Sequence, residues 1–481
     1  MGVGSLAFSL ACGGGTGGGF NGGGGGGTGN FSNASLSGQY VYQLKGYDSN
    51  GPFREAGVFT ADGNGHITGG KDDFSSGTSV FPDTTTGGSY QVSGSGLAIV
   101  TLNFASGASS TFDLTLSSSS QFYMIEIDLG VSASGTAQKQ DTTVLTALPT
   151  GTFVTRMHTL NSSQSLASTI GALTVAGDGT ISGNMDRKTN ASFGSSTITS
   201  GNLNFPDPSF GRGSGTLSDS VAGASSFSYY VVDSTHLILF SMDAGKLGVG
   251  QAEKQSGGPF NAASFTGPYA FASVGDTTVS EGTNSAGRFD ADGSGAINNG
   301  VLDAVSDGTV ANVNFTGTYT AATNGRVAVS LTEGSNSIQQ VYWMVSPSRA
   351  FTITNSPTSI EDGSVDKQVG TFSTATLNGI YAFGITGFDG SLTNDLTGTL
   401  TGNGSGTLNM VLLPNVNGQI PAQNQTQSFS GTYTVSNNGR VVGSLNNFSS
   451  NLIMYMVSSS QAYIIQTDSN VELHGAMTLQ P

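Results

Sequence analysis

Asp290, Asp292 and Ser294 are spaced like the first oxygen ligands of a calcium-binding loop. They lie in FDADGSGAIN (289–298), where Gly295 occupies the position at which such a loop turns sharply. The loop also needs a bidentate carboxylate at its twelfth position, but that residue is Val301, and no helical pattern flanks the segment. These residues are therefore a weak calcium candidate, and no other metal site and no cofactor is expected.

The same phrase recurs three more times, and its acidic residues do not persist. The copies are FTADGNGHIT (59–68), LTVAGDGTIS (173–182) and LTGNGSGTLN (400–409). What persists is a glycine after Asn, Asp or Ser, set between two apolar runs. That combination is a strong signal for a tight β-hairpin, because such turns need positive φ angles. The phrase therefore predicts hairpins, including one over residues 290–303, rather than a calcium site.

Candidates for acid–base or nucleophilic chemistry are few. Asp72 and Asp73 form a pair, and an acidic residue recurs at or near the second position as Asp186 and Asp303. Paired carboxylates need a cleft to act as acid and base, so we expect these residues to be solvated strand ends. The histidines, none of which recurs between repeats, are His66, His158, His236 and His474. HExxH, CxxC and GxSxG motifs are absent from the sequence, so no catalytic residue and no enzyme activity is predicted.

Four long repeats organise the chain. Each opens on Gly-x-aromatic, at Gly38, Gly151, Gly267 and Gly379, which are 112 to 116 residues apart. Each closes on a glutamine, and these are Gln140, Gln255, Gln368 and Gln480. A unit of this length is a normal domain, much larger than a propeller blade. The expected domains are residues 36–140, 149–255, 265–368 and 377–480, each of which should fold by itself.

Within each repeat, apolar and polar residues alternate over short runs bounded by Gly, Asn, Asp and Ser. Alternation of this kind marks antiparallel strands with one buried face. About eight such runs per repeat predict an all-β chain of four eight-stranded up-and-down barrels, since closure removes exposed sheet edges. β-sandwiches are the alternative. Bulky residues expected to fill the barrel interiors are Phe59, Phe289, Tyr319 and Phe351.

The charge balance bears on partners. The chain has 31 acidic and 15 basic residues, a formal charge of −16, and charged residues make up only 10% of it. Nucleic acid is therefore an unfavourable partner, because phosphate binding draws on clustered Lys and Arg.

The N-terminal segment predicts the cellular location of the protein. MGVGSLAFSLAC (1–12) is an apolar stretch that ends on Cys12, the single cysteine, and a glycine-rich tether follows over 13–35. Leu10-Ala11-Cys12 resembles the lipobox of bacterial lipoproteins, in which the cysteine thiol receives a diacylglycerol. With the repeated GxYxF…ADGxGxI…GTY units, the layout resembles repeat-bearing secreted lipoproteins of acidobacteria. The resemblance implies lipidation at Cys12 and a place in the cell envelope, anchored to the outer membrane or secreted, and it implies no established activity.

Two functions from different classes remain open. The first is a non-catalytic surface lipoprotein whose four β domains form a stalk or adhesive array for an extracellular partner or glycan. The second is a small-molecule-binding barrel of lipocalin-like or avidin-like type, which would bind its ligand in a barrel mouth. A site repeated four times should keep its polar or aromatic residues in every repeat, whereas mainly turn glycines and core residues recur.

Overall fold

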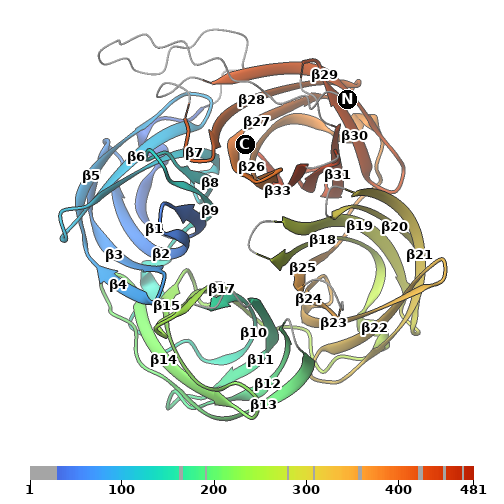
Figure 1. The fold of residues 1–481 in the computed structure, drawn as a ribbon, viewed down its shortest axis with the longest axis horizontal. Coiled ribbons are helices and arrows are strands. Elements are labelled where there is room, and N and C mark those ends of the chain that lie inside the picture. Colours follow the sequence, from blue (N-terminus) through green and yellow to red (C-terminus); the bar gives the residue numbers. More distant parts are fainter. Residues whose placement is uncertain are drawn as a thin grey trace.

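The computed structural model shows four β-barrels joined in a closed ring (Figure 1). It describes residues 30–161, 166–189, 192–278, 281–306, 309–355, 360–420, 426–447, 451–468 and 471–481. The prediction of an all-β chain with four tandem eight-stranded antiparallel barrels is confirmed. The barrels form a ring rather than a linear stalk, and the last barrel lies against the first.

Each barrel is built from consecutive strands of one repeat. Barrel 1 contains β1 (Ser37–Asp48), β2 (Gly51–Asp62), β3 (His66–Ser76), β4 (Ser79–Asp83), β5 (Thr85–Val92), β6 (Leu97–Phe104), β7 (Ser109–Ser118), β8 (Gln121–Glu126) and β9 (Ser132–Lys139). Barrel 2 contains β10 (Gly151–Asn161), β11 (Leu166–Val175), β12 (Ile181–Thr189), β13 (Phe193–Leu203), β14 (Arg212–Asp219), β15 (Gly223–Val231), β16 (His236–Ser241) and β17 (Lys246–Lys254).

The other two barrels follow the same plan. Barrel 3 contains β18 (Thr266–Thr278), β19 (Glu281–Asp292), β20 (Ala296–Ser306), β21 (Thr309–Ala321), β22 (Arg326–Glu333), β23 (Asn336–Ser346), β24 (Arg349–Asn355) and β25 (Ile360–Lys367). Barrel 4 contains β26 (Asn378–Asp389), β27 (Leu392–Asn403), β28 (Thr407–Val416), β29 (Gln427–Val435), β30 (Arg440–Leu445), β31 (Asn451–Ser458), β32 (Gln461–Gln466) and β33 (Val471–Leu479). Short 3-10 helices precede the barrels: η1 (Asn33–Ser35), η2 (Thr142–Val144), η3 (Ala262–Ser264) and η4 (Thr374–Thr376).

Every barrel is an up-and-down meander in which neighbouring strands in sequence pair antiparallel. The first strand of each barrel pairs with its last strand, which closes the sheet and removes its edges. Barrel 1 differs by one extra strand, since β4 pairs with β3 as an outer hairpin while β5 continues the barrel. Within the described ranges, no helix is long and apolar enough to span a membrane.

The recurring glycine phrase forms hairpin turns. In the turn between β19 and β20, Asp292 Oδ1 accepts backbone N–H groups from Ser294 (2.7 Å), Gly295 (2.9 Å) and Ala296 (2.9 Å). These donors lower the pKa of Asp292, Ala296 first, because they stabilise the carboxylate. Gly295 has φ 120°, which explains why a glycine recurs there.

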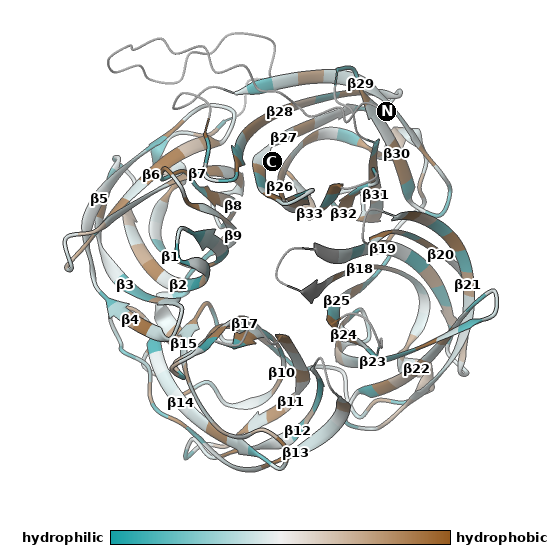
Figure 2. Ribbon diagram, in the orientation of Figure 1, coloured by the Kyte–Doolittle hydropathy of each residue, from teal (hydrophilic) through white to brown (hydrophobic). Residues whose placement is uncertain are grey.

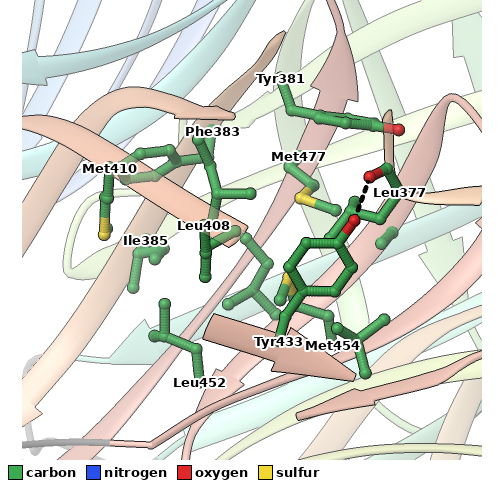
Figure 3. Close-up of a cluster of buried hydrophobic side chains, with 14 of the residues drawn as sticks. Leu377, Tyr381, Phe383, Ile385, Leu408, Met410, Tyr433, Leu452, Met454 and Met477 are labelled. Carbon is green, nitrogen blue, oxygen red and sulfur yellow. Dashed lines mark hydrogen bonds between the residues drawn. The ribbon is translucent and has the colours of Figure 1, made fainter. Parts of the chain in front are cut away.

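Large apolar side chains fill the barrel interiors. Hydrophobic and hydrophilic residues are interspersed along the strands (Figure 2), and along β22 buried positions alternate with more exposed ones. Figure 3 shows the cluster inside barrel 4, where Tyr381, Phe383, Met410 and Met454 are each at most 1% exposed. Tyr433 reaches from the barrel wall, and its hydroxyl donates to the Leu377 carbonyl (2.6 Å) at the barrel end. Phe59, Phe289 and Tyr319 occupy interiors as expected, but Phe351 lies outside its barrel, where it joins a buried cluster of barrels 2 and 3.

The closing glutamine of each repeat fastens its barrel to the next one. Each side-chain amide donates to two backbone carbonyls of the following barrel, at distances of 2.5 to 3.1 Å. Gln480 makes this contact with Ser95 and Leu116 of barrel 1. Barrel 4 is therefore attached to barrel 1 in the same way as each other barrel is attached to the one that follows it. These glutamine hydrogen bonds are the same at all four junctions, which is consistent with the regular geometry of the ring.

Three of the four junctions also share a buried ion pair. Asp73, Asp186 and Asp303 lie on β3, β12 and β20, and each accepts a two-pronged hydrogen bond from an arginine of the next barrel. The expectation that these three carboxylates and Asp72 are solvated strand ends was wrong, since all four residues are at most 4% exposed. A strand position that looks terminal in the sequence becomes interior once a second barrel covers it, and the arginine compensates the cost of burying the charge.

Candidate functional site

The ring encloses a central cavity of about 480 Å³. Residues from all four barrels line it, mostly from the strand pairs β1/β9, β10/β17, β18/β25 and β26/β33. These are the first and last strands of each barrel, and Figure 1 shows them nearest the centre of the ring. The cavity therefore lies between the barrels rather than inside one.

The wall positions are equivalent in geometry but not in residue type. Three residues after each opening aromatic, the four barrels present Gln43, Arg156, Ala272 and Gly384. Five residues after it, they present Lys45, His158, Val274 and Thr386. Each barrel therefore places a different residue at the same level of the axis. One asymmetric site results, instead of four copies of a symmetric one.

The cavity wall is richer in cations than the chain as a whole. It includes four of the 15 Lys and Arg residues and two of the four histidines, but only two of the 31 acidic residues. The wall cations are Lys45, Arg54, Arg156 and Arg349, and the acidic residues are Asp362 and Asp395. A chain with a formal charge of −16 thus places a disproportionate share of its basic residues around this cavity.

Asp362 of β25 is the focus of this charge. Its Oδ1 lies 3.0 Å from His158 Nδ1, and its Oδ2 lies 3.6 Å from Arg156 Nε, both on β10 of the neighbouring barrel. Burial by itself would raise the pKa of Asp362. The hydrogen bond to His158 and the charges of His158, Arg156 and Lys45 outweigh burial and hold the pKa below its usual range. One carboxylate therefore contacts His158 and Arg156 and is also stabilised by the charge of Lys45.

A second ionic cluster centres on Arg349, which borders both this cavity and another of about 450 Å³. Its guanidinium contacts Glu253 of barrel 2 (2.7 and 2.8 Å) and Asp366 of its own barrel (2.8 and 2.9 Å). Tyr463 of barrel 4 donates its hydroxyl to Asp366. Three barrels meet at this arginine, whose charge two carboxylates already balance.

Uncharged hydrogen-bonding and aromatic groups complete the wall. Side-chain amides come from Gln43, Gln121, Gln251 and Gln461. Tyr47 of barrel 1 and Phe388 of barrel 4 also line the cavity and meet edge to face, with ring centroids 5.7 Å apart. Such a mixture of amides, hydroxyls and aromatic rings suits a polar ligand with some apolar surface.

The His158–Asp362 pair is also the arrangement that orients an imidazole as a general base. Acyl transfer would need a nucleophile beside that imidazole. Ser364 lies on β25 with Asp362, and its hydroxyl accepts a hydrogen bond from Arg156 Nη1 (3.2 Å).

The residues considered as calcium ligands make other contacts in the structure. Asp290 is held by Arg288 (2.6 and 2.9 Å) and Asn299 (2.8 Å), while Asp292 organises the hairpin turn beside Ser294. Over the part of the chain that the structure describes, no group of three or more His, Cys, Asp or Glu residues is placed to hold a metal. Cys12 lies outside the described residues, as does most of the 13–35 tether.

The structure brings together two histidines that the sequence left scattered. His158 and His474 both line the central cavity, whereas His66 and His236 are the first residues of β3 and β16 and are absent from its lining. A search for residues that recur between repeats could not find this site, because a site on the axis of a ring uses each barrel's differing residue. The signal available in the sequence was the opposite of recurrence. A basic residue of one repeat, such as Lys45 or Arg156, is replaced by other residue types at the matching positions of the other repeats.

The fold and site together define a class, a closed ring of four up-and-down β-barrels around an asymmetric polar cavity. No protein-family model matches the chain, and no curated protein matches it. Among solved structures, intact Ap-TbpB (N and C lobes) is 10% identical over 77% of this chain and 86% of that one, with a TM-score of 0.18. CghA with Sch210972 is 8% identical over 92% of this chain and 88% of that one, with a TM-score of 0.15. Similarities this weak carry no argument about function.

Proposed function

We propose that this protein is a non-catalytic binding protein that takes a small polar ligand in the cavity at the centre of its ring. The observation that carries the proposal is the asymmetric wall, to which all four barrels contribute different polar groups. A volume of about 480 Å³ is within the range of small-molecule sites, roughly 300–1,000 Å³.

The barrel interiors support this location for the site. Each interior is filled by a cluster of buried apolar side chains, so ligand binding in a barrel mouth, as in lipocalin-like proteins, has less support. Large apolar residues recur inside the barrels, whereas the residues that face the axis differ between repeats. An adhesive role on the outer surface, towards an extracellular partner or glycan, stays a prediction.

The test is a thermal-shift screen with sugars and their acids, using glucose, galactose, glucuronate and galacturonate as probes. We expect at least one probe to raise the Tm of the wild type. Ser134→Trp should abolish the shift, because Ser134 lines the cavity and an indole would fill it. Thr199→Trp is the control, since Thr199 is exposed on an outer strand. A shift that Ser134→Trp leaves unchanged would place binding elsewhere.

We further propose that the protein acts in the cell envelope, attached to the membrane through a lipid on Cys12. This part rests on the sequence before the first barrel and is tested in cells. Cys12→Ser should move the protein from the membrane fraction to the soluble fraction. Unchanged partitioning would refute the anchor without touching the binding proposal.

A further inference from the structure

We infer that closure of the ring is sensitive to pH and that Asp113 of β7 is the group responsible. When its carboxyl group is protonated, barrel 4 and barrel 1 pack together. When it is ionised, this junction weakens and the ring opens beside the central cavity. The inference goes beyond the proposed function, because it concerns closure of the ring whether or not a ligand is bound.

The position of Asp113 carries the first step. In the sheet of barrel 1 it lies directly opposite Ile99 of β6 and Ile125 of β8, on the same face of the strands. Both isoleucines pack in the buried cluster that includes Leu413 of barrel 4. The threonine two positions further along β7 accepts a hydrogen bond from Thr397 Oγ1 of barrel 4 (2.8 Å). Asp113 therefore faces barrel 4 in a largely apolar contact.

The surroundings of the Asp113 carboxyl group carry the second step. Asp113 is 5% exposed, and within the described part of the chain its Oδ1 atom has no hydrogen-bond partner. An ionised carboxylate in such a place is costly, and a proton removes that cost by neutralising it. Burial raises the pKa of Asp113 to about 7. Below that pH the closed ring contains a neutral acid, and above it an uncompensated charge.

The other ionisable groups of the junction do not supply the missing compensation. Strands β6–β9 of barrel 1 and β26–β28 of barrel 4 form this junction. Besides Asp113, the ionisable residues on these strands and in the turn after β8 are Glu126, Asp128, Asp389, Asp395, Lys139, Tyr123 and Tyr381. Burial raises the pKa of all four carboxyl groups and of both tyrosines. The lysine is exposed at the end of β9. The neighbouring acids therefore respond to pH in the same direction as Asp113.

The equivalent positions of the other barrels show that the fold does not need an acid at this place. Barrels 3 and 4 have Val341 and Ile453 where barrel 1 has Asp113, and each is 4% exposed. Barrel 2 has Ser228, whose hydroxyl donates to Asp73 (2.7 Å). None of these three side chains titrates. The acid in barrel 1 thus adds a response to pH that packing alone does not require.

Opening of the junction would free Asp113 from burial and return its pKa to the ordinary value of about 4. Its contribution to closure is therefore full below pH 4, declines as pH rises, and is lost above pH 7. For this carboxyl group, the equilibrium constant for opening should rise on the order of 100-fold between pH 5 and pH 8. Opening would also expose the central cavity, since Tyr123 and Ser132 of barrel 1 and Thr386 and Asp395 of barrel 4 line it.

The experiment follows the contact between barrels 1 and 4 with two pyrene labels in the full chain. Leu129→Cys and Gln419→Cys place exposed thiols beside the point where the Gly130 N–H donates to the Gly418 carbonyl (3.0 Å). Cys12→Ser removes the native thiol. Excimer emission reports the closed ring, and circular dichroism reports the folded strands, both during urea titration. We expect the excimer to be lost at lower urea at pH 8 than at pH 5, and at pH 8 before the strand signal.

Asp113→Asn and Asp113→Val should each remove most of this difference between the two pH values, the second by copying barrel 3. Glu55→Gln with Asp72→Asn is the control, because these buried acids contact Tyr42 inside barrel 1, and the excimer should keep its pH dependence. Three results would overturn the inference: an excimer midpoint that is equal at pH 5 and pH 8, a pH dependence that both Asp113 variants retain in full, or simultaneous loss of excimer and strand signal at pH 8.

Discussion

Three junctions of the ring join barrels that are consecutive in sequence, here called serial junctions, and a fourth joins barrel 4 to barrel 1. The four junctions share one geometry, but the serial junctions are ionic and the closing junction is apolar. At the serial junctions a buried aspartate of one barrel meets an arginine and an aromatic donor of the next. Those arginines are Arg212, Arg326 and Arg440, and the aromatic donors are Tyr230, Trp343 and Tyr455. Where barrel 4 meets barrel 1, the position of the aspartate is Leu413, that of the arginine is Leu97 and that of the aromatic donor is Thr115.

The closing junction therefore replaces an ion pair with an apolar contact. Leu413 and Leu97 belong to one buried cluster with Ile125 and Ile127, all at most 5% exposed. Hydrogen bonds supplement it, including Thr397 Oγ1 to Thr115 Oγ1 (2.8 Å) and Asn415 Nδ2 to two carbonyls of barrel 1 (2.6 and 2.7 Å). The same packing of two barrels is thus stabilised by buried apolar surface at one junction and by a compensated ion pair at the other three.

The difference teaches how the order of barrels is specified. If barrel 1 followed barrel 2 or barrel 3, a buried aspartate would face Leu97 with no arginine to compensate it. If barrel 4 preceded an arginine-bearing barrel, that arginine would face Leu413. Both mismatches cost several kcal/mol, because they leave a buried charge unpaired. Barrel 4 against barrel 1 is the arrangement in which each charge has a partner, and the ring closes.

The largest effect is expected from a charge placed in the closing junction. Leu413→Asp removes apolar contacts and buries a carboxylate against Leu97, so it should lower the free energy of unfolding by at least about 4 kcal/mol. Urea unfolding followed by circular dichroism measures it. Adding Leu97→Arg recreates the serial arrangement and should recover part of the loss. Failure of the second change to recover any stability would show that the two kinds of junction are not interchangeable.

The reciprocal change at a serial junction should have the next largest effect. Asp186→Ala leaves Arg326 without its partner and removes the acceptor of Trp343 Nε1 (2.8 Å), at a cost of about 3 kcal/mol. Trp343 is the single tryptophan, so its fluorescence reports on this junction directly. The double change Asp186→Leu and Arg326→Leu imitates the closing junction and should be less harmful than Asp186→Ala alone. A double variant less stable than the single one would contradict this comparison.

A smaller effect, dependent on pH, should distinguish barrel 1 from barrel 4. Inside barrel 1, Tyr42 Oη contacts Glu55 (3.1 Å) and Asp72 (2.7 Å), where barrel 4 has Leu396 and Leu412. Burial raises the pKa of Asp72 to about 7 and that of Glu55 well above its usual value. The folded state therefore holds protons that the unfolded chain releases above its own pKa of about 4.

The stability from these carboxyl groups is full below pH 4 and declines as pH rises towards 7. The loss for Asp72 should be on the order of 3 kcal/mol. Tm measured between pH 5 and 8 should fall for the wild type. In the isosteric variant Glu55→Gln with Asp72→Asn, the fall should be smaller. Parallel curves for the two proteins would exclude these groups as the source.

The smallest effect is expected from calcium. Asp290 is occupied by Arg288, and Asp292 is occupied by the backbone of its own turn, so titration with millimolar calcium should give no saturable heat. A micromolar site that Asp290→Ala abolished would contradict the hairpin assignment. Asp292→Ala should lower the Tm slightly, because the turn loses its acceptor while Gly295 still supplies the backbone conformation.

Much of the architecture was predictable from the sequence. The Asn, Asp or Ser before glycine fixed the hairpins, since these turns depend on local backbone conformation. Alternation of apolar and polar residues predicted strands with one buried face, and the opening aromatic residues Tyr40, Tyr269 and Tyr381 are all buried. The number of repeats gave the number of barrels. These features follow from interactions between residues close in the chain, which a sequence displays directly.

The ring and its site were decided by tertiary structure. The sequence contains Arg326 and Arg440 in visible NGR turns, but their partners Asp186 and Asp303 lie more than 130 residues away. Which aspartate is buried depends on which barrel covers it, and no local pattern encodes that. Likewise Lys45, Arg156 and Asp362 come from three repeats and meet because the ring brings their inner strands to one axis. Local conformation sets the barrels, whereas the long-range matching of charge and shape between them sets the ring and its cavity.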